Sequence, residues 1–340
     1  MAFDRRRFLG AATASLGVTL AAPLLADRRH PPIARVIVDN DFAGDPDGLF
    51  QLAHHLLCRS VEIPLLIGSH LPPQFGGATS ATAAVAKVRA LLEVMGRTGQ
   101  HRVVEGSQTA IVSPDRRQPS PATAAIIAEA MRTDVSTPLF YAAGGGLTDL
   151  ALAWLAEPRI ARRLRLVWIG GPEHPGIAVP PPGADKIEFN LSLDPVAAEL
   201  VFNRADIEIW QVPRDAYRAM LFPRDALSEL VDSPIGRFLA GEVDAMEAKL
   251  ATIPGFPPLP ASDVMILGDS PLVTLTGLLP PLQPDPSSSR YVTIPTPMLT
   301  KEGGYRARPQ GRAMRVYTAI DTELTFRDMT AKFRRFGNNA

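Results

Sequence analysis

The chain has 340 residues, with 35 lysines and arginines against 35 aspartates and glutamates, so its formal net charge is zero. A balanced charge offers no basic field to a nucleic-acid backbone, which argues against nucleic acid as a partner. Hydrophobic residues make up 46% of the sequence, enough to build the core of one large domain or two small ones. The single cysteine, Cys58, excludes an internal disulfide and is expected to be a small core residue.

The first 26 residues are typical of an export signal. Asp4-Arg5-Arg6-Arg7-Phe8-Leu9 precedes a moderately apolar stretch, rich in alanine and leucine, that reaches Ala26. Paired arginines before such a stretch resemble a twin-arginine export signal, and the short apolar part favours a cleaved signal over a membrane anchor. We therefore expect an exported, periplasmic protein that has no stable membrane span after cleavage.

Strand-like and helix-like segments alternate through the first two thirds of the chain. Short apolar runs predict strands, and longer periodic runs predict the helices between them. This alternation indicates βαβ units and a mostly parallel open α/β sheet of Rossmann-like type, with helices on both faces. The expected strands are 36–38, 63–67, 139–143, 164–169 and 207–212, and the expected helices are 49–57, 81–95, 121–131, 147–155 and 195–202.

The last third of the chain shows different patterns. Helical patterns cover 222–250 and 264–279, proline-rich segments cover 253–260 and 280–289, and strand-like runs cover 291–294 and 314–320. We expect the late strands to form a hairpin-like appendage and the first proline-rich segment to form a wall of a site. Residues 33–320 are thus predicted to be one α/β domain, followed at 321–340 by a basic C-terminal tail with a surface helix.

The densest functional signal lies where the first predicted strand meets the first predicted helix. Asp39, Asp41, Asp45 and Asp47 fall within nine positions there. Ligands of open α/β folds bind at this carboxyl edge of the strands. Four crowded carboxylates repel one another, and their hard oxygen atoms favour Ca²⁺ or Mg²⁺ over zinc. One or two such acids would be ordinary turn formers or helix caps, whereas four indicate a site.

Three further stretches carry glycines or polar groups at similar positions. A glycine turn, Gly144-Gly145-Gly146-Leu147-Thr148-Asp149, lies between a strand and a helix; Glu188-Phe189-Asn190 precedes Asp194-Pro195; and Asp269 opens a late apolar helix. The glycine turn lets a ligand approach the backbone, but it lacks the lysine of a phosphate-binding P-loop. Taken alone, Asp269 fits a helix cap as well as a metal ligand, and Glu188 and Asn190 fit surface residues.

Together and in this order, between residues 33 and 279, these stretches resemble the nucleoside hydrolase family, in particular its inosine–uridine-preferring type. The matching segments are Asp39/Asp41, Gly145-Gly146-Leu147-Thr148-Asp149, Gly170-Gly171, Glu188-Phe189-Asn190, Asp194-Pro195-Val196-Ala197-Ala198 and Asp269. The resemblance implies a nucleoside hydrolase-like α/β fold and calcium-dependent hydrolysis of the N-glycosidic bond of a nucleoside or related riboside. Its relatives include dimers and tetramers, so a homo-oligomer stays open.

The resemblance also implies roles for individual residues. Calcium would be held by Asp41, by Asp45 or Asp47, by Asp269 and by the carbonyl oxygen of Gly144. Asp41 would take a proton from metal-bound water, which attacks the anomeric carbon of an oxocarbenium-like transition state. The substrate-binding residues would be Asp39, Asn40, Glu188, Phe189 and Asn190, with Glu188 and Asn190 on the sugar.

Several positions depart from the family pattern. The usual adjacent aspartates are split in Asp45-Pro46-Asp47, and Gly268 stands where a histidine usually precedes the late aspartate. The residues expected to bind the metal and the sugar therefore match the family pattern, whereas those expected to recognise the base do not. This difference predicts an unusual aglycone. The candidates for a replacement acid are His70, Glu173 and His174.

Two other functions stay open. An exported, metal-dependent sugar-binding protein with little or no catalysis is favoured by Gly268 and opposed by the retention of Asp41 and Asp269. The Asp-x-Asp pattern at Asp39 also resembles the loop of haloacid-dehalogenase-like phosphatases. That chemistry needs a lysine after a later strand, and Lys87, Lys186 and Lys249 do not follow this pattern.

Overall fold

The computed structural model describes residues 30–252, 257–283, 285 and 287–338. The signal expected at residues 1–26 lies outside this part, as do residues 253–256 of the first proline-rich segment. A single structural unit begins at Pro32 and contains the domain expected at 33–320. No helix in the described ranges is both long enough and apolar enough to span a membrane.

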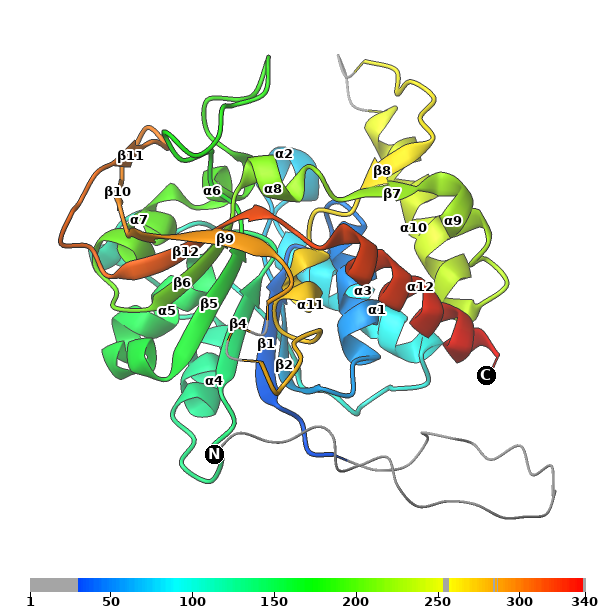
Figure 1. Ribbon diagram of the computed structural model, residues 1–340, viewed down its shortest axis with the longest axis horizontal. Helices are drawn as coiled ribbons and strands as arrows, with labels where there is room; N and C mark the ends of the chain where they lie inside the picture. The colour runs from blue at the N-terminus through cyan, green and yellow to red at the C-terminus, as the bar shows by residue number, and fades with distance from the viewer. Residues whose placement is uncertain (1–29, 253–256, 284, 286, 339–340) are drawn as a thin grey trace, which may run out of the picture. The chain divides into compact units, whose positions relative to one another are not determined.

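An eight-stranded sheet organises this unit, in the order β3-β2-β1-β4-β5-β6-β12-β9 (Figure 1). Its strands are β1 (Ala34–Asn40), β2 (Val61–Gly68), β3 (Val103–Glu105), β4 (Leu139–Ala143), β5 (Leu164–Ile169), β6 (Glu208–Val212), β9 (Arg290–Pro295) and β12 (Ala313–Ala319). Every neighbouring pair is parallel except β9 with β12. The predicted fold class, a mostly parallel α/β sheet, is confirmed, and all five predicted strands are present.

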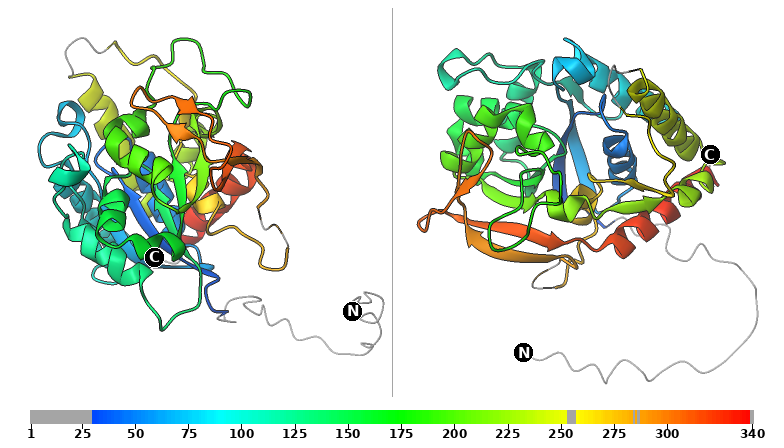
Figure 2. Two further views of the ribbon diagram at one scale, coloured as in Figure 1. Left: turned by 90° about the vertical axis from the view of Figure 1, so that its left-hand side faces the viewer. Right: turned by 90° about the horizontal axis from the view of Figure 1, so that it is seen from above.

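Helices cover both faces of the sheet (Figure 2). The longer ones are α1 (Asp47–Leu56), α3 (Ser80–Val94), α4 (Pro121–Ala130), α5 (Thr148–Ala156), α7 (Pro195–Asn203), α10 (Pro234–Leu250) and α12 (Thr322–Gly337). Val36 and Val38 of β1 belong to the core under α1, α10 and α12, whereas Ile37 belongs to the core under α4, α5 and α7. Successive side chains of a strand point to opposite faces, so burial on both faces accounts for the three consecutive apolar residues at the centre of β1.

Shorter elements connect these layers. They are α2 (Pro73–Gly76), α6 (Phe189–Leu193), α8 (Arg214–Tyr217), α9 (Arg224–Ser228), α11 (Pro271–Thr274), the 3₁₀ turns η2 (Pro114–Arg116) and η3 (Pro158–Arg162), and the strand pairs β7 (Leu221–Pro223) with β8 (Val264–Ile266) and β10 (Met298–Leu299) with β11 (Tyr305–Arg306). Helix α7 begins as predicted, because the Asp194 carboxylate accepts a hydrogen bond from the Ala197 N–H at 2.8 Å and Pro195 fills the first turn.

The prediction of a helix at 264–279 is wrong. Its first residues form β8, and the helical part is limited to the four residues of α11. Gly268 lies in the turn between them, and Pro271 has no N–H to continue a helix from the residues before it. This break turns Asp269 toward the carboxyl edge of the sheet.

The expectations for the C-terminal part also need correction. Strands β9 and β12 do pair antiparallel, but β12 also pairs in parallel with β6, so they extend the main sheet and are not an appendage. The basic tail expected at 321–340 is largely the helix α12. Thr325, Met329 and Phe333 recur every four residues and are fully buried, which makes this helix part of the core.

Candidate functional site

A cavity of about 420 Å³ opens at the carboxyl ends of β1, β4 and β5. Eight of the ten predicted site residues line it: Asp41, Asp45, Asp47, Gly144, Glu188, Phe189, Asn190 and Asp269. The other walls come from α2, α8, α10 and β8. Residues more than 220 positions apart in the sequence thus meet in one place, as expected for the edge of a parallel sheet.

Short polar contacts hold the acids together. Asp41 directly follows β1, and its loop closes with a hydrogen bond from the Gly44 N–H to the Asp41 carbonyl oxygen at 2.7 Å. Asp47 begins α1, and its Oδ2 accepts a hydrogen bond from the Asp269 N–H at 3.2 Å. Asn40 donates from Nδ2 to Asp269 Oδ2 at 2.8 Å. The late turn is therefore tied both to the end of β1 and to the start of α1.

The carboxylates in this cavity are costly to ionise together. Burial raises the pKa of Asp41 and Asp47 well above the ordinary value, and the neighbouring Asp269 raises both further. Burial raises the pKa of Asp269 to about 7. Burial also raises the pKa of Asp45, although Asp45 is more exposed to solvent than Asp41, Asp47 and Asp269. Because burial and mutual repulsion both disfavour the charged forms, a cation among these acids would remove the penalty.

The residues present fit a hard divalent cation such as Ca²⁺. Carboxylate oxygens and the Gly144 carbonyl form an all-oxygen donor set, and no histidine or cysteine is among the described residues of the wall. A Cβ atom at Gly144 would lie 2.8 Å from Asp269 Oδ2, so this position needs glycine for the turn to approach the acids. Asp39 Oδ1 and Asn40 Oδ1 are buried without a hydrogen-bond partner beside this set.

Glu188 and Asn190 form a preorganised polar wall opposite the acids. The Glu188 carboxylate caps α6 and accepts from the backbone N–H groups of Asn190, Leu191 and Gly171 at 3.1, 2.9 and 2.6 Å. It also accepts from the Tyr217 hydroxyl at 2.8 Å. Asn190 donates from Nδ2 to the carbonyl oxygens of Gly144 at 3.1 Å and Ile169 at 2.9 Å. Both side chains are thus fixed before any ligand arrives.

Asp39 and Asn40, predicted to bind substrate, lie behind the wall of the cavity. They are 1% and 0% exposed, and neither lines the cavity. Asp39 Oδ2 accepts a hydrogen bond from the buried Tyr141 hydroxyl, and burial followed by repulsion from Asp149 raises the Asp39 pKa to about 8. In this position Asn40 contacts the site through its hydrogen bond to Asp269, and Asp39 lies one residue further back on β1.

The three candidates for a replacement acid lie outside the cavity. His70 is buried against the Thr148 hydroxyl, Glu173 pairs with Arg214, and His174 bonds Gln211 and stacks on a tyrosine. Two other side chains with N–H or O–H donors do line the cavity: Tyr217, which lies beside Gly268, and Lys249. Neither residue belongs to a motif, so no sequence pattern pointed to them.

Tyr217 packs beside Gly268, the position at which the family pattern has a histidine. A Cβ atom at Gly268 would lie 3.3 Å from Tyr217 Cδ2 and 3.3 Å from Asp47 Oδ2. Lys249 is exposed at the mouth, where its Nζ donates to the Phe75 carbonyl oxygen at 2.7 Å. Phe75 and Phe189 are both partly exposed, with ring centroids 5.9 Å apart. Two aromatic rings and a cationic side chain therefore lie together at the mouth of the cavity.

A different group of metal-ligand residue types lies at the far end of α1. His54, Cys58 and Asp328 have ligand atoms within 4.8 Å of one another, the one such group among the described residues. Lys332 Nζ donates to Cys58 Sγ at 3.1 Å and also to Asp328. The lysine ammonium therefore already supplies a cation there. This group lines no part of the 420 Å³ cavity.

The sheet is mostly parallel, helices cover both of its faces, and an acid-rich cavity opens at its carboxyl edge. These features define an α/β protein with a polar ligand site. A sequence model described as "Inosine-uridine preferring nucleoside hydrolase" matches residues 36–322. The chain belongs to this family.

Two curated relatives share a short segment with the chain. The inosine-uridine preferring nucleoside hydrolases of Crithidia fasciculata and Leishmania major are each 45% identical over 69 residues, which is 20% of this chain. The match spans 19% of the length of each relative.

Solved structures extend the similarity to nearly the whole fold. The inosine-uridine preferring nucleoside hydrolase from Bacillus anthracis is 20% identical with a TM-score of 0.63, covering 89% of this chain and 99% of its own. The purine-preferring ribonucleoside hydrolase from Gardnerella vaginalis is 18% identical with a TM-score of 0.62, and the match covers 90% of this chain and 100% of that structure. At this level of identity the comparison shows a common fold.

Proposed function

We propose that this protein hydrolyses the N-glycosidic bond of a nucleoside or related riboside with the help of Ca²⁺. The observation that carries the proposal is the meeting of Asp41, Asp47 and Asp269 with the fixed pair Glu188 and Asn190 in one cavity. Family membership supports this assignment, because the cavity keeps the metal and sugar residues that the family motifs imply.

Asp41, Asp47, Asp269 and the Gly144 carbonyl would hold the calcium. Asp47 is preferred over Asp45, because Asp47 is the less exposed of the two and its Oδ2 accepts a hydrogen bond from the Asp269 backbone N–H. Calcium, when bound, would neutralise these acids and make water in the cavity more acidic. Asp47 therefore supplies the second loop ligand despite the split Asp45-Pro46-Asp47.

Different side chains would carry out the separate steps of the reaction. Asp41 accepts the proton of the attacking water as general base. Glu188 binds the sugar hydroxyls and stabilises the positive charge that develops on the ring. Because backbone N–H groups and Tyr217 already fix this carboxylate, it needs little rearrangement in the transition state.

Departure of the base needs a proton or a hydrogen bond on the leaving nitrogen. Tyr217 and Lys249 are the donors on that side of the cavity, and Phe75 and Phe189 offer faces for a planar base. Burial raises the pKa of Tyr217 above the ordinary value, and its hydroxyl proton is directed at Glu188. Lys249 is therefore the better candidate to contact the base, and Tyr217 the group that positions Glu188.

The test is a titration of the chelated full-length protein with Ca²⁺, followed by inosine and uridine with an assay for released base. We expect saturable calcium binding and calcium-dependent base release that Asp41→Asn removes. Undiminished hydrolysis by Asp41→Asn would refute the mechanism. Ribose binding that requires Ca²⁺ without any base release would favour the alternative function, a metal-dependent sugar-binding protein, which Gly268 in place of histidine supports.

We propose further that residues 1–26 direct export to the periplasm through the twin-arginine route. The support is the run Arg5-Arg6-Arg7-Phe8-Leu9 before the alanine-rich stretch. Replacing all three arginines by lysine should retain the full-length protein in the cytoplasmic fraction of cells that express it. Unchanged export of this variant would refute the twin-arginine assignment.

A further inference from the structure

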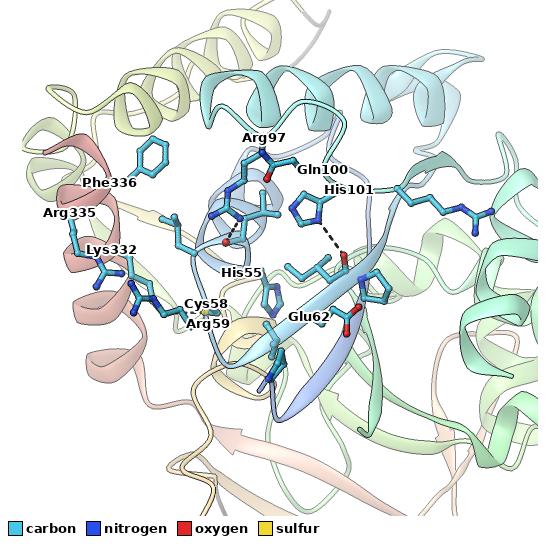
Figure 3. A pocket seen from close by; sticks show the side chains of 17 residues that line it. His55, Cys58, Arg59, Glu62, Arg97, Gln100, His101, Lys332, Arg335 and Phe336 are labelled. Atoms are coloured by element: carbon cyan, nitrogen blue, oxygen red, sulfur yellow. Dashed lines mark hydrogen bonds between the residues drawn. The ribbon is translucent and has the colours of Figure 1, made fainter. Parts of the chain in front are cut away.

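A second cavity, of about 700 Å³, lies at the opposite edge of the sheet (Figure 3). Residues just before β1 and at the start of β2 form its floor, and the end of α1, the loop after α3 and the last turns of α12 form its walls. It shares no lining residue with the acid-rich cavity.

The charge of this second cavity is strongly positive. Its lining includes five arginine or lysine side chains and a single acid, Glu62. The basic residues come from three segments that are distant in sequence: Arg59 after α1, Arg97 after α3, and Lys332 with Arg335 on α12. Figure 3 shows these side chains around the same hollow. In a chain with zero net charge, such a local excess creates a site for anions.

Most of this positive charge has no acidic partner. Lys332 is engaged by Asp328 and Cys58. Arg97 donates from one guanidinium nitrogen to the Leu56 carbonyl oxygen at 2.6 Å. In the described part of the chain, no carboxylate lies within 4 Å of the guanidinium groups of Arg59, Arg97 or Arg335. These groups retain N–H donors for an incoming oxyanion.

Several apolar side chains also line this cavity. Val61, Ile63 and Pro64 lie on the floor, Leu56 lies on the wall formed by the end of α1, and Phe336 follows Arg335 on α12. A suitable ligand would therefore carry an anionic head and a small apolar or planar body. The recess is concave, so it fits a small soluble molecule better than a flat membrane surface or a nucleic-acid helix.

We propose that this cavity binds a small organic phosphate, with the phosphate on Arg59, Arg97 and Arg335 and the organic part against Phe336. A phosphate carries up to two negative charges and three acceptor oxygens, which suits several arginine forks better than a single carboxylate does. The proposal is independent of the hydrolase activity, since the two cavities have separate walls.

The test uses calorimetric titration of the calcium-free full-length protein with phenyl phosphate, with inorganic phosphate and benzoate as the comparison ligands. We expect one site per chain, weaker binding of the comparison ligands, and affinity that falls with salt. Arg335→Gln should weaken phenyl phosphate binding about tenfold or more. Arg334→Gln is the matched control, because Arg334 is the adjacent exposed arginine on α12, pairs with Glu229 and lies outside this cavity.

Each outcome decides the proposal. A selective loss in Arg335→Gln, with Arg334→Gln and Asp41→Asn within about twofold of the wild type, supports it. Equal weakening by both arginine variants would show diffuse surface charge and overturn it, as would the absence of binding by the wild type at millimolar phenyl phosphate. Loss of binding in Asp41→Asn would place the ligand in the acid-rich cavity and also overturn it. Both arginines are exposed, so neither variant should disturb folding.

Discussion

The two cavities at opposite edges of one sheet carry opposite charge in different ways. In the acid-rich cavity, Asp41 and Asp269 are short, buried side chains fixed by the end of β1 and by backbone contacts. In the basic cavity, Arg59 and Arg335 are long, exposed side chains with few fixed contacts. Charge that is buried and fixed acts strongly at short range, whereas exposed charge is screened by solvent.

This difference teaches where function should be sensitive to mutation. A fixed, buried carboxylate cannot be replaced by a neighbour, so its loss should abolish an activity. A mobile surface arginine shares its task with others, so its loss should weaken binding in steps. The following predictions test that contrast, in order of decreasing effect.

Asp41→Asn should give the largest change. Removal of the general base is expected to lower kcat for base release by about 10²- to 10⁴-fold. The melting temperature should not fall, because the substitution also removes one of the mutually repelling buried acids. Steady-state kinetics with a thermal unfolding scan would check both. A variant that unfolds early would indicate that Asp41 is structural.

Calcium should stabilise the protein by relieving the repulsion in the acid-rich cavity. At a free concentration of about 1,000 Kd, a ligand specific for the folded state adds about 4 kcal/mol. Thermal unfolding with excess Ca²⁺ and with chelator measures this difference. The same shift in Asp269→Asn would mean that calcium binds elsewhere, whereas Arg335→Gln should keep the wild-type shift.

The pH dependence of the unfolding free energy should reveal the burial of His55, which lines the basic cavity. His55 is fully buried at its wall, and burial, followed by the charges of His54 and Lys332, lowers its pKa from 6.5 to about 3. The unfolded chain binds a proton below 6.5 and the folded protein does not, so stability falls as pH decreases from 6.5 toward 3. His55→Gln should reduce the slope of unfolding free energy over this interval. An unchanged slope would contradict the burial argument.

The sequence revealed much of the acid-rich site because most of its members are local. Asp39 to Asp47 fall in one strand-to-helix segment, so the alternation of elements places them at the sheet edge. Glu188-Phe189-Asn190 is contiguous, but only its resemblance to a family motif linked it to the site. The distant Asp269 was found through its place at the start of a predicted late helix and through the family resemblance. The separation of Asp39 and Asn40 from the wall could not be predicted, because it depends on side-chain direction at the end of β1.

The parts that were missed depend on packing between distant elements. Tyr217 and Lys249 reach the cavity because α8 and α10 cover its mouth, and no local pattern encodes that position. The helix predicted at 264–279 failed because apolar composition was given more weight than Gly268 and Pro271. The late strands were recognised, but their place beside β6 requires a pairing that spans about a hundred residues.

Tyr217→Phe should have a smaller effect than the loss of Asp41. It removes one of the hydrogen bonds that fix Glu188, so kcat/KM is expected to fall about tenfold with Ca²⁺ affinity unchanged. Initial rates and calcium titration would measure both. Lys249→Gln is the companion variant, and it should alter the preference among bases, because Lys249 lies at the mouth and does not touch Glu188. Unchanged rates for both variants would leave base departure to another group.

Arg335→Gln should change hydrolysis least, with kcat/KM within about twofold of the wild type. Seven residues of β1 separate the two edges, about 20 Å of strand, and the screening length at physiological salt is about 8 Å. Direct electrostatic coupling is therefore negligible. The connection that could break this independence is α1, since Asp47 at its start lines one cavity while His55 and Leu56 near its end line the other. If phenyl phosphate changes kcat/KM in the wild type and not in Arg335→Gln, a shift of α1 couples the cavities. If it has no effect on hydrolysis in either protein, the two edges of the sheet act separately.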